Sequence, residues 1–177
     1  MSPLGAGLLG AAIALGAALA VAAVRHRPPR RRAAPAGARR VLVPFSGALD
    51  QTVLDAAIRV AKAEEAVLVP AYLLVVPLQY PEDSAQKEQV ALALPLLEAV
   101  EHAALRAGVP VDARIEKGRS LTHALRRLWG VERFDRIVAP APGAPGNGGF
   151  TPKQLTWILE HAPAETIVLR PGERIAA

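Results

Sequence analysis

The residues best suited to chemistry in this 177-residue chain lie in two glycine-containing segments. One is Pro44-Phe45-Ser46-Gly47, and the other is the run PAPGAPGNGG at 140–149, which Lys153 and Gln154 follow closely. Glycines let backbone N–H groups approach a phosphate, and the first turn of a following helix adds partial positive charge. The chemistry that these segments could support is binding of a phosphate-bearing ligand.

Most catalytic and metal sites are excluded by residue type or by spacing. Without cysteine, the chain has no thiolate metal site, disulfide or cysteine nucleophile. The four histidines, at 26, 102, 123 and 161, are too scattered to predict a metal site. The glycine run lacks the Gly-Lys-Ser/Thr of a P-loop, no G-x-S-x-G occurs, and no base is positioned for Ser46. We therefore predict no catalytic residue and no metal, and slow ATP hydrolysis is the only enzymatic activity left to consider.

The high isoelectric point comes from one end of the chain. The pI is about 10.2, which by itself would favour a nucleic-acid partner. However, the first 40 residues hold seven arginines and no acidic residue, so all 16 acidic residues but only 14 of the 21 basic ones follow Arg40. The remainder of the chain is mildly acidic, and no nucleic-acid partner is predicted.

The N-terminus carries an uncharged apolar run, SPLGAGLLGAAIALGAALAVAAV, at 2–24. As a helix it would span about 34 Å, enough to cross a hydrocarbon core of about 30 Å. A single transmembrane helix over 1–24 competes with a cleavable signal peptide, for which Ala18-Leu19-Ala20 and Ala20-Val21-Ala22 resemble cleavage sites. A buried core helix is the third interpretation, and the apolar run on every face argues against it. Because basic residues follow the run instead of preceding it, we expect a single-pass anchor with the domain on the cytoplasmic side of the cell membrane.

Residues 25–39 predict an extended linker. The sequence at 25–40, RHRPPRRRAAPAGARR, has three prolines and no apolar periodicity. Beside a membrane, each arginine gains on the order of 1 kcal/mol from anionic headgroups. A nucleic-acid arm is the rival interpretation, but the adjacent apolar run favours membrane lipid as the partner of both segments.

From Arg40 onward, apolar runs alternate with amphipathic segments. The order is β-α-β-α-β-α-β-α-β, with strands expected at 41–45, 66–76, 109–115, 135–139 and 166–169, and helices at 50–63, at 85–107 and from Ser120 and Thr151. Pro95 should kink or split the second helix. This alternation predicts a Rossmann-like α/β domain at 40–172, a five-stranded parallel sheet between helices, with a tail at 173–177. Ligands of such sheets bind beyond the carboxyl ends of the strands, here at 44–49 and 140–151.

Several of these segments together resemble the universal stress protein family. They are VLVPFSG at 41–47, the turn at Gly118, FDRIVAP at 134–140, the loop with Gly143 and Gly146, and LEHAPAETIVLRP at 159–171. The resemblance covers about 40–171. It implies a nucleotide-binding or signalling role in stress response and homodimerisation through the last strand, whose free edge pairing would cover.

The chain departs from the pattern of the nucleotide-binding members. Those members carry an Asp after the first strand, where Ser46 stands here, and a G-x2-G-x9-G-[S/T] loop for ATP phosphates. The four positions of that loop fall on Pro140, Gly143, Lys153 and Gln154, and a register shifted to Gly143 and Gly146 ends on Thr156 and Trp157. If ATP binding is nevertheless retained, the resemblance assigns the site to Pro44, Phe45, Ser46, Gly143, Gly146, Lys153 and Gln154.

The start of the last helix also disfavours a phosphate. Thr151-x-x-Gln154 has the spacing of a capping box, and Pro152 at the first helical position supplies no N–H group. We therefore expect a membrane-anchored, non-catalytic sensor or scaffold without a firm cofactor. The alternatives are an ATP-binding protein with a remodelled phosphate loop and a regulatory subunit of a membrane transporter, the latter with a membrane-protein partner.

Overall fold

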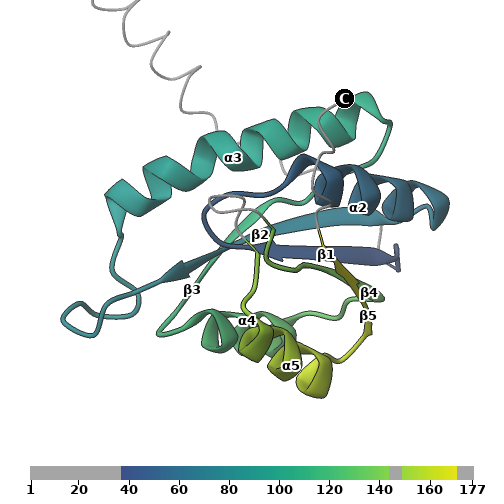
Figure 1. Cartoon of the computed structure of the whole chain (residues 1–177). Helices are drawn as coiled ribbons and strands as arrows, with labels where there is room; N and C mark the ends of the chain where they lie inside the picture. The colour runs from purple at the N-terminus through teal and green to yellow at the C-terminus, as the bar shows by residue number, and fades with distance from the viewer. Residues whose placement is uncertain (1–36, 144–148, 171–177) are drawn as a thin grey trace, which may run out of the picture. The chain divides into compact units, whose positions relative to one another are not determined.

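The computed structural model describes residues 37–143 and 149–170, and it confirms the predicted alternation of strands and helices (Figure 1). In chain order the elements are β1 (Arg40–Phe45), α2 (Gln51–Ala63), β2 (Val67–Val75), α3 (Lys87–Arg106), β3 (Arg114–Gly118), α4 (Leu121–Val131), β4 (Arg136–Pro140), α5 (Pro152–His161) and β5 (Glu165–Leu169).

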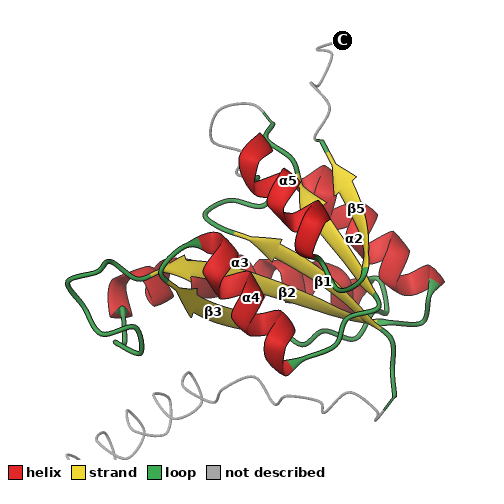
Figure 2. Cartoon of the chain, turned by 90° about the horizontal axis from the view of Figure 1, so that it is seen from below, coloured by secondary structure: helices red, strands yellow, loops and turns green. Residues whose placement is uncertain are grey.

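All five strands are parallel and lie in the order β3-β2-β1-β4-β5. The chain builds outward from β1 to β2 and β3, then returns to the other side of β1 for β4 and β5. The strand order therefore reverses between β1 and β4, which is where ligands of open parallel sheets bind. Helices α2 and α3 cover one face of the sheet, and α4 and α5 cover the other (Figure 2).

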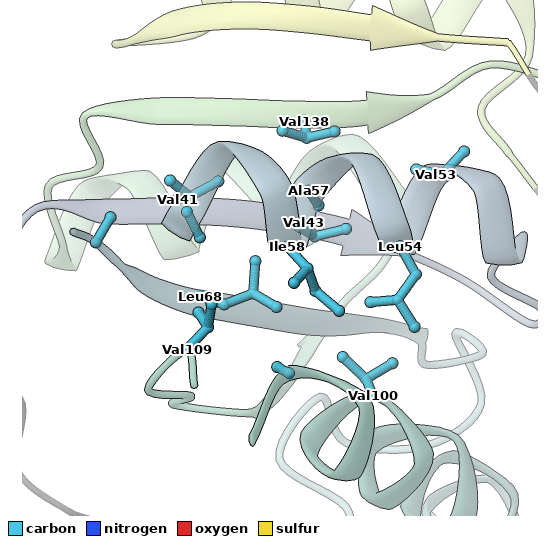
Figure 3. Close-up of a cluster of buried hydrophobic side chains, with 13 residues drawn as sticks. Val41, Val43, Val53, Leu54, Ala57, Ile58, Leu68, Val100, Val109 and Val138 are labelled. Carbon is cyan, nitrogen blue, oxygen red and sulfur yellow. The ribbon is translucent and has the colours of Figure 1, made fainter. Parts of the chain in front are cut away.

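The central strand is apolar on both faces because both are covered. Val41 and Val43 point toward α2 and α3, where they pack in a cluster with Leu54, Ile58 and Val100 (Figure 3). On the opposite face the core contains Leu42, Ile137, Leu125, Leu128, Phe150 and Ile158. Aliphatic and alanine side chains fill most of this core, as the low aromatic content of the sequence predicts.

Two local predictions were wrong in part. The third strand begins at Arg114, and of the residues before it Val111 makes only an isolated bridge to Leu68. Pro110, in this stretch, has no N–H group for a strand ladder. Helix α3 runs unbroken from Lys87 to Arg106 although Pro95 lies inside it. Pro95 is exposed, so water can satisfy the carbonyl group that loses its helical partner.

The predicted transmembrane helix at 1–24 and the linker up to residue 36 lie outside the described residues, as does the tail after Arg170. Among the helices that the structure describes, none is both long enough and apolar enough to span a bilayer.

Candidate functional site

The carboxyl ends of β1 and β4 lie side by side at one edge of the sheet, as expected for neighbouring parallel strands. Pro44 and Phe45, predicted as ligand contacts, are buried instead. The ring of Phe45 packs edge-on against Tyr72 of β2, its register partner, with ring centroids 5.5 Å apart. The side chains of Pro44 and Phe45 therefore lie in the core, and a ligand contact at either residue stays a prediction. Ser46, the next residue, is partly exposed at the edge of the sheet.

The helix that follows β1 is capped by a carboxylate. The Asp50 side chain accepts a hydrogen bond of 2.8 Å from the Thr52 amide, at the N-terminus of α2. This carboxylate takes the position at the start of α2 that would otherwise suit an anion. Asp50 was not among the predicted site residues, although an Asp directly before an apolar helical stripe is itself a capping signal.

The loop between β4 and α5 is closed at its base. The Phe150 amide donates to the Pro140 carbonyl at 2.8 Å, and the Ala141 amide donates to the Leu169 carbonyl at 2.7 Å. Gly149 has a φ of +99°, and a β-carbon there would lie 2.5 Å from the Ala141 oxygen. Phe150 itself is buried against α4 and α5. The chain thus leaves the core after β4 and re-enters it within ten residues.

Of the two loop glycines predicted to approach a ligand, only one can be placed. Gly143 is half-buried, whereas Gly146 lies outside the described residues.

Helix α5 satisfies its own N-terminus. The Thr151 hydroxyl accepts from the Gln154 amide at 3.4 Å, and the Gln154 side-chain oxygen accepts from the Thr151 amide at 2.8 Å. Pro152 supplies no donor. The capping box predicted from the sequence is therefore confirmed. Lys153 is exposed and forms no ion pair with any residue that the structure describes.

The site thus combines a switch-point position with helix N-termini that have their own caps. Two of the predicted residues lie in the core, and Gln154 is engaged in the cap of α5. Ser46, Gly143 and Lys153 remain at the carboxyl edge of the sheet. Within the described ranges, no cluster of three or more histidine, cysteine or acidic side chains could hold a metal ion. Among the described residues of this site, the Lys153 ammonium group is the clearest donor to a phosphate.

No protein-family model and no curated protein matches the chain. Solved structures do match it. A universal stress protein from Archaeoglobus fulgidus is 14% identical, with a TM-score of 0.56 over 73% of this chain and 92% of that one. The protein UspA from Lactobacillus plantarum is 18% identical, with a TM-score of 0.56 over 75% and 97% of the two chains.

A third similar structure contains a nucleotide. It is a universal stress protein family protein from Arabidopsis thaliana with AMP bound, 16% identical, with a TM-score of 0.55 over 76% of this chain and 93% of that one. At these identities the likeness concerns the backbone arrangement. The domain described here has the fold of the universal stress proteins.

Proposed function

We propose that the chain is a membrane-anchored, non-catalytic sensor or scaffold in stress response, whose universal stress protein-like domain acts by binding another protein. The observation that carries this proposal is the self-capped N-terminus of α5. In a phosphate site at a helix N-terminus, the first-turn N–H groups are open to the anion. Here the Thr151 and Gln154 amides each donate to the side chain of the other residue, and Pro152 has no N–H group to offer.

The segment after β1 supports the same conclusion. The Asp50 carboxylate caps α2, and Ser46 stands where the nucleotide-binding members carry an Asp. A phosphate entering this site would have to displace the capping box of α5, which costs about 1 kcal/mol, because the N-terminus of α2 is already capped by Asp50.

Adenine nucleotide binding is the second candidate function. One similar structure is described as a complex with cAMP and another as having AMP bound. In this chain, the feature that favours a nucleotide is the exposed Lys153 side chain in the first turn of α5.

The proposed anchor and dimer rest on different observations. The anchor rests on the uncharged run at 2–24 and on the basic residues that follow it, which would hold the domain at the cytoplasmic face. The homodimer rests on β5, which pairs with β4 along one edge and has Val168 38% exposed. Pairing with β5 of a second copy would cover that edge.

Thermal unfolding of the full chain in a mild detergent tests the choice between the two functions. We expect no change in Tm with millimolar ATP and Mg²⁺, AMP or cAMP. A ligand at one hundred times its Kd stabilises by about 2.7 kcal/mol, so binding would raise the Tm by several degrees. Such a rise would refute the proposal, and its loss in Lys153→Ala would place the nucleotide at α5.

The anchor is tested separately by washing membranes with carbonate. The full chain should stay in the pellet, and a chain that begins at Arg39 should not. Release of the full chain would contradict the anchor.

A further inference from the structure

A loop between β2 and α3, residues 76–86, projects beyond the carboxyl edge of the sheet (Figures 1 and 2). Its first half, which we call the tip, is apolar. The sequence from 75 to 81, VVPLQYP, contains no charge. Leu78 is 85% exposed and Tyr80 is 50% exposed, so two large apolar side chains of this projecting segment stand in solvent.

The backbone of this tip is held by one arginine. The Arg119 guanidinium donates through Nη1 to the carbonyl groups of Pro77 at 2.8 Å, Tyr80 at 3.0 Å and Val76 at 3.3 Å. The Tyr80 amide turns back to the Pro77 carbonyl at 3.1 Å. Because Arg119 already donates hydrogen bonds to these carbonyl groups, burial of the tip against an apolar surface would not leave them without a hydrogen-bond partner.

The second half of the loop is fixed by three further contacts. Glu82 accepts from Arg127 of α4 at 2.8 Å, and this hydrogen bond lowers the pKa of the Glu82 carboxyl group. The Lys117 ammonium donates to the Ser84 carbonyl at 2.6 Å, and the Ser84 amide donates to Pro81 at 3.0 Å. Cationic side chains of β3 and α4 therefore order the loop before any partner arrives, which reduces the entropy lost on binding.

We infer that this loop is the surface through which the domain docks on its partner, and that the partner is a protein with an apolar pocket and a cationic rim. Large apolar side chains on an ordered backbone, with polar groups around them, are the features of a binding hot spot. Leu78 and Tyr80 would enter the pocket. The inference deepens the proposed function and rests on it, because it identifies the surface that such a binding protein uses.

The charges around the tip favour a cationic protein rim over an anionic lipid surface. Asp83, Lys87 and Glu88 are exposed beside the tip, so the two carboxylates leave one net negative charge, and Asp83 forms no ion pair with any residue in the described ranges. The Arg119 and Lys117 side chains are directed at carbonyl groups of the loop, and Arg127 is paired with Glu82. Anionic headgroups would meet unpaired carboxylates, whereas a cationic rim would pair with them.

The test uses the full chain in membranes of the cells that make it. Gln79, exposed between Leu78 and Tyr80, is replaced by the photo-crosslinking residue p-benzoylphenylalanine. The matched control carries it at Leu92, a 70% exposed leucine on α3. We expect one discrete protein adduct from position 79 and not from position 92. Mass spectrometry should map it to apolar residues of the partner.

The adduct must depend on the chemistry of the loop. Leu78→Ser and Asp83→Lys should each lower its yield at least tenfold, and Leu92→Ser should leave it unchanged. An adduct to lipid alone, to a second copy of this chain, or to a protein whose capture ignores Leu78 and Asp83 would overturn the inference. So would the absence of any adduct.

A second measurement tests the role of Arg119 as a positioning residue. Arg119→Met keeps an unbranched side chain but removes every N–H donor to the three carbonyl groups. Amide hydrogen exchange at 76–86 should become faster, and the adduct yield from position 79 should fall. Unchanged exchange would show that Arg119 does not hold the loop.

A rise in Tm with ATP would refute the proposed function and leave the adduct in place, whereas adducts from position 92 alone would refute only this surface.

Discussion

Gly118, the last residue of β3, lies in direct contact with the backbone of Ala124 in α4. A β-carbon on Gly118 would stand 2.5 Å from the Ala124 nitrogen and 2.9 Å from its α-carbon. Both atoms belong to the backbone of a helix and cannot move aside locally. This contact sets how closely α4 approaches the sheet, and it therefore also sets where Arg119 and Arg127 stand relative to the β2–α3 loop.

Gly118→Ala should destabilise the domain by about 1–3 kcal/mol, because the added methyl group overpacks a backbone contact. Gly130→Ala is the matched control. Gly130 also lies in α4, where an added methyl group would meet no neighbouring element within 4 Å, and the change should gain up to about 1 kcal/mol of helix propensity. Urea unfolding of the two variants should give opposite signs. Equal effects would show that the contact between Gly118 and Ala124 is not tight.

Glu101 on α3 should make the domain less stable at neutral pH than in mild acid. Burial raises the pKa of its carboxyl group, and the nearby Glu98 carboxylate raises it further. The folded state therefore holds this proton more tightly than the unfolded state, whose pKa is near 4.5. As pH rises through this value toward the folded pKa, stability falls, and the loss persists at pH 7.

Glu101→Gln should consequently raise the free energy of unfolding at pH 7, and the gain should vanish below about pH 4. Urea titrations across this pH range measure it. Glu160→Gln, which removes an exposed carboxylate from α5, is the control for loss of a surface charge. A loss of stability in Glu101→Gln at pH 7 would contradict the prediction.

Asp112 should have the opposite pH dependence. Burial alone would raise the pKa of its carboxyl group, but hydrogen bonds from Arg114 at 2.7 Å and Arg40 at 2.9 Å outweigh burial and lower the pKa. Its stabilising contribution is therefore present above the unfolded pKa of about 3.8 and is lost as pH falls through the lower folded value.

Asp112→Asn should cost about 1–3 kcal/mol at pH 7, since the two half-buried guanidinium groups of Arg40 and Arg114 then share only the Glu132 carboxylate. It should also make stability less dependent on pH in the acid range, which acid unfolding followed by circular dichroism would detect. Asp83→Asn removes an exposed carboxylate without an ion pair in the described ranges and should change neither quantity. If both variants unfold at the same pH as the unmodified chain, the contribution of Asp112 is negligible.

Periodicity and capping residues predicted most of the fold. Val41-Leu42-Val43 indicated a strand covered on both faces, and Ser120 and Thr151 marked the two helix starts at which their side chains now accept amide hydrogen bonds. These signals are local. The start of β3 could not be predicted from local signals, because 109–113 has the alternation of a strand. Only the folded chain shows that this stretch makes a single isolated bridge to Leu68 instead of a ladder.

The site was harder to predict than the fold. Pro44 and Phe45 were assigned to a ligand because they end a strand, but the burial of Phe45 depends on its pairing with Tyr72 of another strand. Likewise, nothing local to Arg119 indicates that its side chain binds three carbonyl groups of a loop some forty residues earlier. Contacts of this kind follow from tertiary structure and have no sequence period.

The capping box on α5 gives the last prediction, which tests why a phosphate should not bind. If Thr151 and Gln154 occupy the donors that an anion needs, then the double variant Thr151→Gly, Gln154→Ala frees them. This variant should lose about 1 kcal/mol of stability in chloride. Inorganic phosphate at matched ionic strength should restore part of that loss, because the exposed amides and the positive end of the helix dipole then face the anion. The unmodified chain should not respond to phosphate.

Adding Lys153→Ala to the double variant should abolish the recovery if the ion binds at α5, and a recovery that persists would place the ion elsewhere. Equal responses of the double variant and the unmodified chain would show that self-capping is not what excludes the phosphate, leaving the Asp50 carboxylate and Pro152 as the remaining barriers.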